Sequence, residues 1–338
     1  MKKLFLGLYL CLTFFPTFGQ RTSVIDNKAV KFEITQENDS INFIVVDTVL
    51  TQMKPVFLWC QGSLSYPLFV QNDNGEIYMF GGGISNFDIS NITKYYHLVV
   101  ISMPKVPVVA AEKDLIDFQY YHPNSDREEK KEFWKADYLE NYVERANIVL
   151  DFLREQSWVD NSKLVVVGHS QGARIAPEIT LKNRNITHLG LSGANPFGRI
   201  DQMIRKARKD AESGKITWEE AEKEMQSWYD LYRDAYNSQE VEKKPFLISW
   251  KSFSEPRIDE WVKINIPIYL FYGTADVTSD LCDIIPLYFI AKGKDNLTIK
   301  RYFNLEHNYF EMGENGVPDW NKPHWVEVMN EFVEWTRK

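Results

Sequence analysis

One ten-residue segment constrains the fold of this chain more than any other. Residues 164–173 read Leu-Val-Val-Val-Gly-His-Ser-Gln-Gly-Ala. The branched apolar run predicts a buried β-strand, and the residues after Gly172 predict a helix. A strand that turns sharply into a helix at Gly-x-Ser-x-Gly lifts Ser170 clear of the backbone, and side chains at the two glycine positions would collide across the turn. The segment therefore predicts a serine that stands at the end of a strand and can act as a nucleophile.

The same turn offers binding groups for a developing negative charge. The backbone N–H of Gln171 lies at the start of the predicted helix and can face an oxyanion. A second donor should follow an earlier strand, and residues 59–63 fit, because Gly62 lets the backbone approach a substrate. We expect the N–H of Ser63 to be this donor, with Gly62 as the alternative.

A serine hydroxyl is a weak nucleophile and needs a histidine base that is oriented by an acid. With this type of turn the chain order is serine, then Asp or Glu, then histidine. We favour His307 as the base because it follows the strand-like run 297–303. His324 also lies downstream, but it stands beside a proline at the start of the last predicted helix and is interpreted as a surface or capping residue. His169, inside the turn, is interpreted as a packed histidine.

Asp276 is the predicted acid. It is the first carboxylate after the apolar run 268–272, and the chain between it and His307 is long enough for one helix and one strand. Asp280 and Asp283 are the alternatives. If neither is the acid, both are interpreted as negative charges at the N-terminus of a helix.

Two kinds of strand pattern indicate the fold class. Residues 31–36 and 41–46 alternate apolar and polar side chains, which predicts an antiparallel hairpin. Four later runs are apolar throughout, as strands covered on both faces are; they lie at 56–60, 98–101, 164–167 and 268–272. Helical spacing of apolar residues follows at 133–156 and 325–335. The pattern predicts an α/β fold whose sheet is mostly parallel, with helices on each side.

Residues 199–263 interrupt this alternation with a helical insertion. Thr217, with Glu220 three residues on, predicts a capping box at the start of its second helix. An apolar stripe that includes Trp228 and Tyr232 follows. We expect the insertion to lie above Ser170, so these two aromatic residues are candidates for the substrate pocket. The alternative is that they pack the insertion against its own base.

These motifs together resemble the α/β-hydrolase superfamily, from about residue 54 to the C-terminus. The resemblance rests on the following segments: Gly168-His169-Ser170-Gln171-Gly172, Tyr272-Gly273-Thr274-Ala275-Asp276, His307 and Gln61-Gly62-Ser63. It implies an eight-stranded, mostly parallel sheet with a cap inserted after the sixth strand, where residues 199–263 lie. The position before Gly62 is often His in that superfamily and is Gln61 here. Esterases, thioesterases and peptidases of this fold share the turn sequence.

The first twenty residues predict a secretory signal peptide. Lys2 and Lys3 precede the apolar run 4–15, which is too short to span a bilayer. Small residues in Thr17-Phe18-Gly19 then stand at the −3 and −1 positions of a cleavage site just before or after Gln20. The expected mature domain is residues 21–338. A buried N-terminal helix or an uncleaved anchor is the alternative. No later apolar run is long enough to cross a membrane.

Cysteine content, net charge and missing motifs exclude several classes of protein. After the predicted cleavage only Cys60 and Cys282 remain; they could pair, but two buried free thiols are favoured. The net charge is −8, so nucleic acid is a poor partner. Metal-ligand motifs are missing from the sequence, and Gly81-Gly82-Gly83 lacks the strand–helix context of a dinucleotide site and is interpreted as a loop. We therefore expect no cofactor and no metal.

The sequence thus predicts an exported serine hydrolase that cleaves a small-molecule acyl substrate through an acyl-enzyme intermediate. A carboxylic ester is favoured as the substrate. A peptidase, an aminopeptidase or a thioesterase of the same fold is the alternative. A non-catalytic binding protein on this scaffold is less expected, because such a protein has no need of a complete Ser-His-Asp set.

Overall fold

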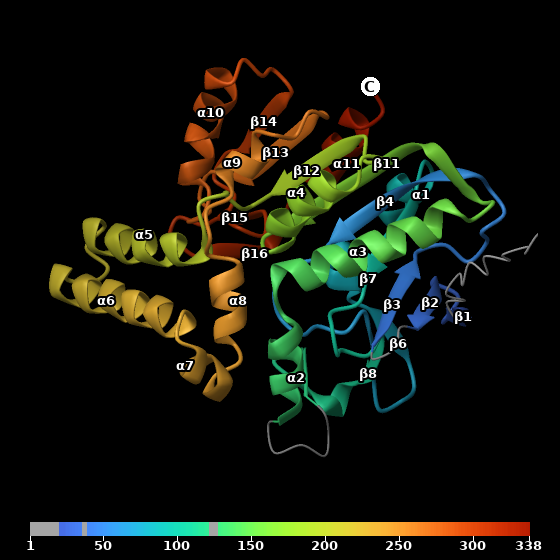
Figure 1. The fold of residues 1–338 in the computed structure, drawn as a ribbon, viewed down its shortest axis with the longest axis horizontal. Helices are drawn as coiled ribbons and strands as arrows, with labels where there is room; N and C mark the ends of the chain where they lie inside the picture. Colours follow the sequence, from blue (N-terminus) through green and yellow to red (C-terminus); the bar gives the residue numbers. More distant parts are fainter. Residues whose placement is uncertain (1–19, 36–38, 122–127) are drawn as a thin grey trace, which may run out of the picture.

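The computed structural model describes residues 20–35, 39–121 and 128–338, so the predicted signal peptide lies almost wholly outside the described residues. The main sheet has nine strands (Figure 1). In spatial order they are β1 (Gln20–Ile25), β2 (Ala29–Thr35), β3 (Ser40–Val45), β7 (His97–Ile101), β4 (Lys54–Cys60), β11 (Val159–His169), β12 (His188–Ser192), β13 (Ile268–Gly273) and β14 (Leu297–Tyr302).

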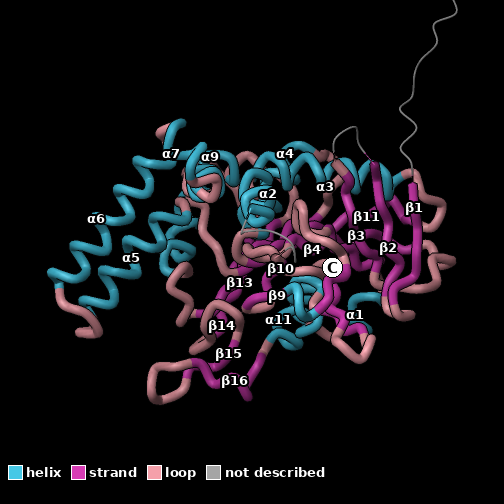
Figure 2. The backbone as a smooth tube through the Cα atoms, turned by 90° about the horizontal axis from the view of Figure 1, so that it is seen from below, coloured by secondary structure: helices cyan, strands magenta, loops and turns pink. Residues whose placement is uncertain are grey.

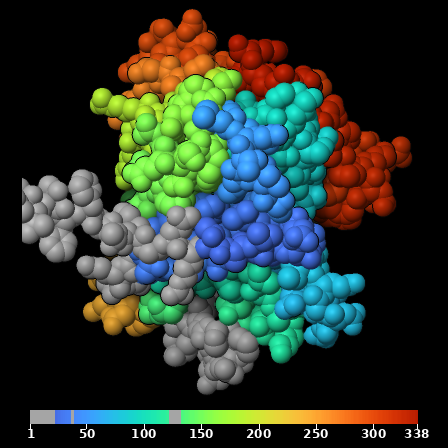
Figure 3. Space-filling model, turned by 90° about the vertical axis from the view of Figure 1, so that its right-hand side faces the viewer, coloured from blue at the N-terminus to red at the C-terminus, as the bar shows by residue number. Residues whose placement is uncertain are grey.

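The sheet is mostly parallel, as predicted. The six strands from β7 to β14 run parallel to their neighbours, and β1, β2 and β3 pair antiparallel at one edge. The predicted hairpin is present, with Val30 opposite Val45 and Thr35 opposite Ser40. The expectation of eight strands is wrong, because β1 adds one at the antiparallel edge. The helical insertion therefore follows the seventh strand of this sheet in chain order, not the sixth. The N-terminal strands are blue in Figure 3, which views the molecule from this edge.

Helices cover both faces of the sheet (Figure 2). One face packs against α3 (Leu139–Arg154) and α4 (Gly172–Lys182), and the other against α1 (Ile89–Thr93) and α11 (Trp325–Trp335). Successive residues of β4 alternate between the two cores: Val56 and Leu58 lie in one, Phe57 and Trp59 in the other. Burial on both faces explains why these strands read as unbroken apolar runs. The predicted helix at 133–156 is divided, because α2 (Glu128–Ala136) ends before Asp137.

The insertion between β12 and β13 is helical, as expected. It contains α5 (Arg199–Glu212), α6 (Trp218–Ala235), α7 (Ser238–Lys243), α8 (Leu247–Ser252) and α9 (Ile258–Trp261). The side chain of Thr217 accepts from the N–H of Glu220, and the Glu220 carboxylate accepts from the N–H of Thr217, so the predicted capping box is formed. Helices α5 and α6 form a hairpin that projects sideways from the body of the molecule (Figures 1 and 2).

Shorter elements complete the chain. The 3-10 helix η1 (Gly81–Asn86) occupies the predicted glycine loop, η2 (Glu112–Asp114) precedes β9, and η3 (Asp280–Ile284) leads into α10 (Ile285–Ala291). The small strands are β5 (Phe69–Gln71), β6 (Ile77–Met79), β8 (Val109–Ala111), β9 (Leu115–Ile116), β10 (Gln119–Tyr120), β15 (Phe310–Met312) and β16 (Pro318–Pro323). Cys60 and Cys282 are both buried and unpaired, as favoured from the sequence. Among the described helices, none is long and apolar enough to cross a membrane.

Candidate active site

The turn between β11 and α4 has the tight geometry that the glycine spacing predicts. Ser170 has φ 56°, in the left-handed region of backbone conformation that residues other than glycine rarely adopt. A Cβ at Gly168 would lie 2.1 Å from the carbonyl oxygen of Gly172, and one at Gly172 would lie 1.9 Å from the carbonyl oxygen of Cys60. Backbone atoms occupy both positions, so only glycine fits, and Ser170 stands at the carboxyl end of the parallel sheet.

We expect Gly172→Ala to destabilise the protein by about 3 kcal/mol or more, because the added methyl group meets backbone atoms of β4 that cannot rotate away. Thermal melting measures the effect. The control is Gly214→Ala, at a turn with φ 75° where a Cβ would meet nothing within 4 Å, so it measures the backbone cost of alanine in the left-handed region without a clash. If Gly172→Ala melts no lower than Gly214→Ala, the close approach of Gly172 to β4 is not as described.

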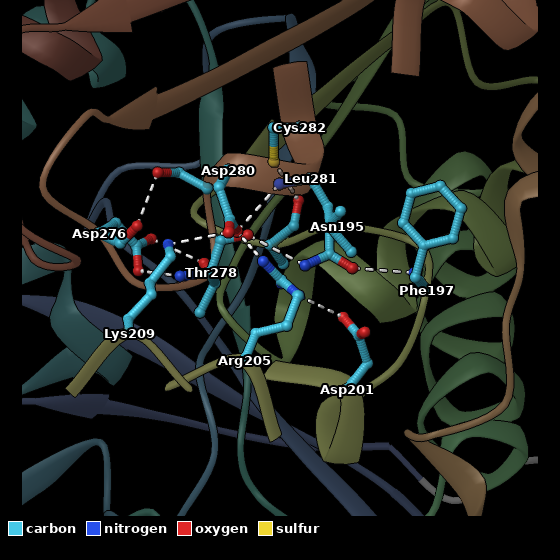
Figure 4. A network of polar contacts seen from close by, with 12 residues as sticks. Asn195, Phe197, Asp201, Arg205, Lys209, Asp276, Thr278, Asp280, Leu281 and Cys282 are labelled. Atoms are coloured by element: carbon cyan, nitrogen blue, oxygen red, sulfur yellow. Dashed lines mark hydrogen bonds and ion pairs between the residues drawn. The ribbon is translucent and has the colours of Figure 1, made fainter. Parts of the chain in front are cut away.

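His307 and Asp276 are directly joined. His307 lies in the loop after β14, and its Nδ1 is 2.9 Å from Oδ2 of Asp276, in the loop after β13. Thr278 also holds the Asp276 carboxylate, because its N–H donates to Oδ1 at 2.9 Å and its hydroxyl donates to Oδ2 at 2.8 Å (Figure 4). The Asp276 side chain is 1% exposed and that of His307 is 29% exposed. The acid is therefore buried, and the imidazole reaches toward solvent.

Burial and charge act in opposite directions on this pair. Burial disfavours the Asp276 carboxylate, but the neighbouring His307 and the hydrogen bonds from His307 and Thr278 outweigh it and hold the pKa of Asp276 below its usual value. Burial also lowers the pKa of His307, yet the negative charge and hydrogen bond of Asp276 raise it by more, so the net pKa is raised. Asp276 is thus ionised at neutral pH and stabilises a protonated His307.

One cavity joins the serine, the histidine and two of the three predicted oxyanion donors, Gly62 and Ser63; Gln171 is not among its described lining residues. It has a volume of about 340 Å³, and its lining includes Ser170, His307, Gly62 and Ser63. A Cβ placed on Gly62 would lie 3.7 Å from the Cβ of Ser170, so the loop after β4 passes beside the serine. Within the described chain, the N–H groups of Gln171, Gly62 and Ser63 donate no hydrogen bond, which leaves them available to a ligand.

The alternative site residues are engaged elsewhere. His324 lies 3.0 Å from the carboxylate of Glu327 at the start of α11. Asp280 pairs with Arg205 and Lys209 of α5 (Figure 4). Asp283 accepts hydrogen bonds from Tyr272 and Arg301. The structure joins only Asp276, of these three carboxylates, to His307.

His169 is packed beneath the cavity. It is 7% exposed, its Nδ1 lies 3.0 Å from the hydroxyl of Ser192, and its ring stacks on Trp59. Burial, followed by the nearby charge of His307, lowers the pKa of His169 to about 3. This imidazole is therefore neutral at physiological pH and serves as part of the floor of the site.

The two aromatic residues expected in the substrate pocket lie elsewhere. The described residues that line the cavity do not include Trp228 or Tyr232. The Trp228 ring packs 5.1 Å from that of Trp250 in α8, and the Tyr232 hydroxyl lies 3.2 Å from that of Tyr236. The helical stripe thus packs α6 against the base of the insertion, since the α5–α6 hairpin projects sideways from the sheet (Figure 2).

Residues that were not predicted to belong to the site complete the cavity wall. Its remaining lining residues are Trp59, Gln61, Leu64, Tyr66, Gly82, Gly83, Asn86, His169, Asn308 and Trp325. Gly82 has φ 62°, and a Cβ there would lie 2.4 Å from Oε1 of Gln61, so glycine lets η1 close on the loop after β4. The triple glycine 81–83 is the sequence signal for this contact, although by itself it predicts only a loop. In the described ranges, no three His, Cys, Asp or Glu side chains gather to hold a metal ion.

Comparison with known proteins identifies the fold. No family model and no curated protein matches the sequence. Among solved structures, the chain is similar over 95% of its length to an acylaminoacyl peptidase from Pyrococcus horikoshii, with 12% identity and a TM-score of 0.54; the match covers 41% of that peptidase, so the chain spans about two fifths of its length.

Two further structures are similar over 92% of this chain. One is a 2,6-dihydroxy-pseudo-oxynicotine hydrolase, with 12% identity, a TM-score of 0.51 and 68% of that chain covered. The other is a thioesterase domain from the curacin biosynthetic pathway, with 11% identity, a TM-score of 0.50 and 99% of that chain covered. This similarity, together with the mostly parallel sheet covered by helices on both faces, shows that the chain has the α/β-hydrolase fold.

Proposed function

We propose that the protein is a serine hydrolase that cleaves a carboxylic ester. The observation that carries this proposal is the hydrogen-bonded Asp276–His307 pair in the same cavity as the strained Ser170. A binding protein on this scaffold has no use for a buried carboxylate that orients a partly exposed imidazole. The arrangement fits nucleophilic catalysis, in which a third group orients the base that activates the nucleophile.

In the proposed reaction, Ser170 Oγ attacks the ester carbonyl while His307 Nε2 takes the hydroxyl proton. The C–O bond to the alcohol breaks as His307 returns that proton to the leaving oxygen, and an acyl-enzyme remains. Water then attacks the acyl carbon with His307 again as base, which releases the acid and restores Ser170. Asp276 holds the imidazole through Nδ1, and the N–H groups of Gln171 and Ser63 bind the oxyanion of each tetrahedral intermediate.

The cavity lining favours an uncharged substrate. Among its described lining residues there is no Asp, Glu, Lys or Arg. Burying a charged group without a partner is costly, so the site lacks what an aminopeptidase needs for a free ammonium group. Neutral esters fit better than amino-terminal peptides or the phosphorylated thioesters of coenzyme A. Acyl-blocked peptides, which carry no amino-terminal charge, are the second candidate class that this lining allows.

The proposal is tested with the purified full-length domain. A fluorophosphonate probe should label one serine, identified as Ser170 by peptide mass mapping. A panel of neutral nitrophenyl esters, acyl-blocked peptide amides and free amino-terminal amides then ranks the substrates, and we expect the neutral esters to be cleaved fastest. Absence of both labelling and hydrolysis would rule out the serine hydrolase.

The His307 pKa predicts the pH dependence of the reaction. The base must be neutral, so kcat/KM should rise with pH and reach half of its maximum at the pKa of His307 in the free enzyme. Because Asp276 raises that pKa, we expect the midpoint to lie above the ordinary value of about 6.5. The measurement uses a neutral ester between pH 5 and 9. A midpoint well below the ordinary histidine value would contradict the Asp276 contact.

We also propose that the protein is exported, with cleavage next to Gln20. The support is the basic, apolar and small-residue order of residues 1–20. Expression with this leader in a Gram-negative host should give periplasmic or secreted protein that begins at Gln20 or Arg21. N-terminal sequencing that finds Met1 on cytoplasmic protein would refute export and leave the hydrolase proposal intact.

A further inference from the structure

The side chain of Gln171 lies between two oppositely charged groups. Its Nε2 donates to Oδ1 of Asp137 at 3.0 Å, and its Oε1 accepts from Nη2 of Arg199 at 3.2 Å. Gln171 is 4% exposed and Asp137 is 6% exposed. The amide therefore bridges a carboxylate and a guanidinium, and both of its ends are used. If the Gln171 amide were flipped, its NH₂ group would face the guanidinium, a donor, and its oxygen would face the carboxylate, an acceptor. One orientation of the amide is therefore strongly favoured.

Both charged groups are themselves held in place. Asp137, between α2 and α3, also accepts from the hydroxyl of Tyr142 at 2.7 Å. Arg199 donates to the Ser249 hydroxyl at 3.3 Å and lies over the Trp250 ring, 4.9 Å from its centre. Helix α8 supplies these last two contacts. The network thus runs from the catalytic turn to both the first and a later helix of the insertion.

Arg199, at the start of the insertion, also packs against the turn between α8 and α9. Its N–H donates to the carbonyl of Phe253 at 3.0 Å, and the N–H of Ile200 donates to the Ser254 hydroxyl at 3.3 Å. Gly198 has φ 126°, and a Cβ there would lie 2.4 Å from the carbonyl oxygen of Ser254. The backbone that carries Arg199 is therefore fixed by the turn between α8 and α9, so the position of the guanidinium depends on the base of the insertion.

We infer that Arg199 is a positioning residue, which acts through the Gln171 side chain to hold the Gln171 N–H where it binds the oxyanion. The insertion thereby influences catalysis from behind the catalytic turn, although its aromatic stripe does not line the cavity. This inference rests on the proposed function, because an oxyanion forms only if Ser170 attacks a carbonyl. Preorganised donors are worth most when they do not move, and a misplacement of about 1 Å can cost roughly 100-fold in rate.

A second arginine of α5, Arg205, also attaches the insertion to the body of the protein. It provides a control that distinguishes positioning of Gln171 from simple attachment of the insertion. Arg205 pairs with Asp201 and with Asp280, on the loop that follows Asp276, and Lys209 also pairs with Asp280 (Figure 4). Arg205 does not contact Gln171 among the contacts of the described chain. Removing Arg205 loosens α5 from the body of the protein but leaves the contacts of Gln171 in place.

The experiment compares Arg199→Met, Arg199→Lys and Arg205→Met on an ester and on its thionoester, in which sulfur replaces the carbonyl oxygen. Sulfur accepts hydrogen bonds weakly, so a correctly placed donor favours the oxygen ester much more than the thionoester. We expect Arg199→Met to lower kcat for the oxygen ester by about 10- to 100-fold and to lower the oxygen-to-sulfur rate ratio by about tenfold. Arg205→Met should leave that ratio within about twofold of the wild type, because the oxyanion donors are undisturbed.

Rates are expressed per fluorophosphonate-labelled site, and melting curves accompany each variant. If Arg199→Met does not fold, Arg199→Lys tests the inference instead. Lysine keeps a positive charge near Asp137 but lacks the forked guanidinium that also reaches Gln171. We expect the oxygen-to-sulfur rate ratio of Arg199→Lys to fall by about threefold or more. An unchanged ratio in the folded Arg199 variants, or an equal fall in Arg205→Met, would overturn the inference. A wild-type protein that neither labels nor cleaves esters would instead overturn the proposed function.

Discussion

Ser170→Ala should lower kcat by about three to six orders of magnitude while leaving the fold intact. The hydroxyl is the proposed nucleophile, and alanine removes it without adding atoms to the crowded turn. The remaining activity would come from the oxyanion donors and from substrate binding alone. The measurement is steady-state hydrolysis of the best neutral ester in the panel, with the protein purified from a host that lacks competing esterases.

Melting curves provide the control, because the variant should unfold close to the wild-type temperature. Fluorophosphonate labelling should disappear at the same time as hydrolysis. Near-wild-type hydrolysis by a well-folded Ser170→Ala protein would mean that the strained turn has a structural purpose only, and the proposed function would then be wrong.

Asp276→Asn should reduce kcat by about four orders of magnitude. An asparagine amide can donate to Nδ1 of His307, which places the imidazole proton on Nε2, the nitrogen that must accept the Ser170 proton. Loss of the negative charge also removes the largest effect that raises the pKa of His307, so the acid limb of the pH profile should move to lower pH. A pH series of kcat/KM on the variant measures both effects.

The matched controls are Asp280→Asn and Asp283→Asn, which should each cost less than about tenfold in kcat. Both side chains lie near Asp276 in the sequence, but Asp280 pairs with α5 and Asp283 with Tyr272 and Arg301. If either control loses more activity than Asp276→Asn, the acid lies farther along the chain than the structure indicates.

The parts of the fold that the sequence predicts are those with local patterns. The unbroken apolar runs predict the parallel strands because both faces of β4 and β11 are buried, and the capping box at Thr217 predicts the start of α6. The Gly-x-Ser-x-Gly turn is equally local: two glycines are required by backbone atoms that lie within 2.2 Å of where a Cβ would be.

Features that depend on distant segments could not be predicted in this way. The helical period around Trp228 shows that one face of α6 is apolar, but it does not show whether that face meets substrate or α8. The cavity wall combines residues 64–66, 82–86 and 308 with Trp325, which are distant in the sequence and meet only after folding. The contact between Arg199 and Gln171 also depends on where the insertion returns to the body of the protein.

The two buried cysteines determine how the folded domain responds to oxidising and reducing conditions. Burial raises the pKa of the Cys60 thiol to about 12 and raises that of Cys282 as well, so neither forms the reactive thiolate while the protein is folded. Neither thiol is bonded to the other, and the described fold is held by packing and hydrogen bonds without a covalent cross-link. The native state therefore contains no bond between these two cysteines that an oxidative folding system would have to form. We expect the melting temperature of the folded domain to be the same with and without a thiol reductant.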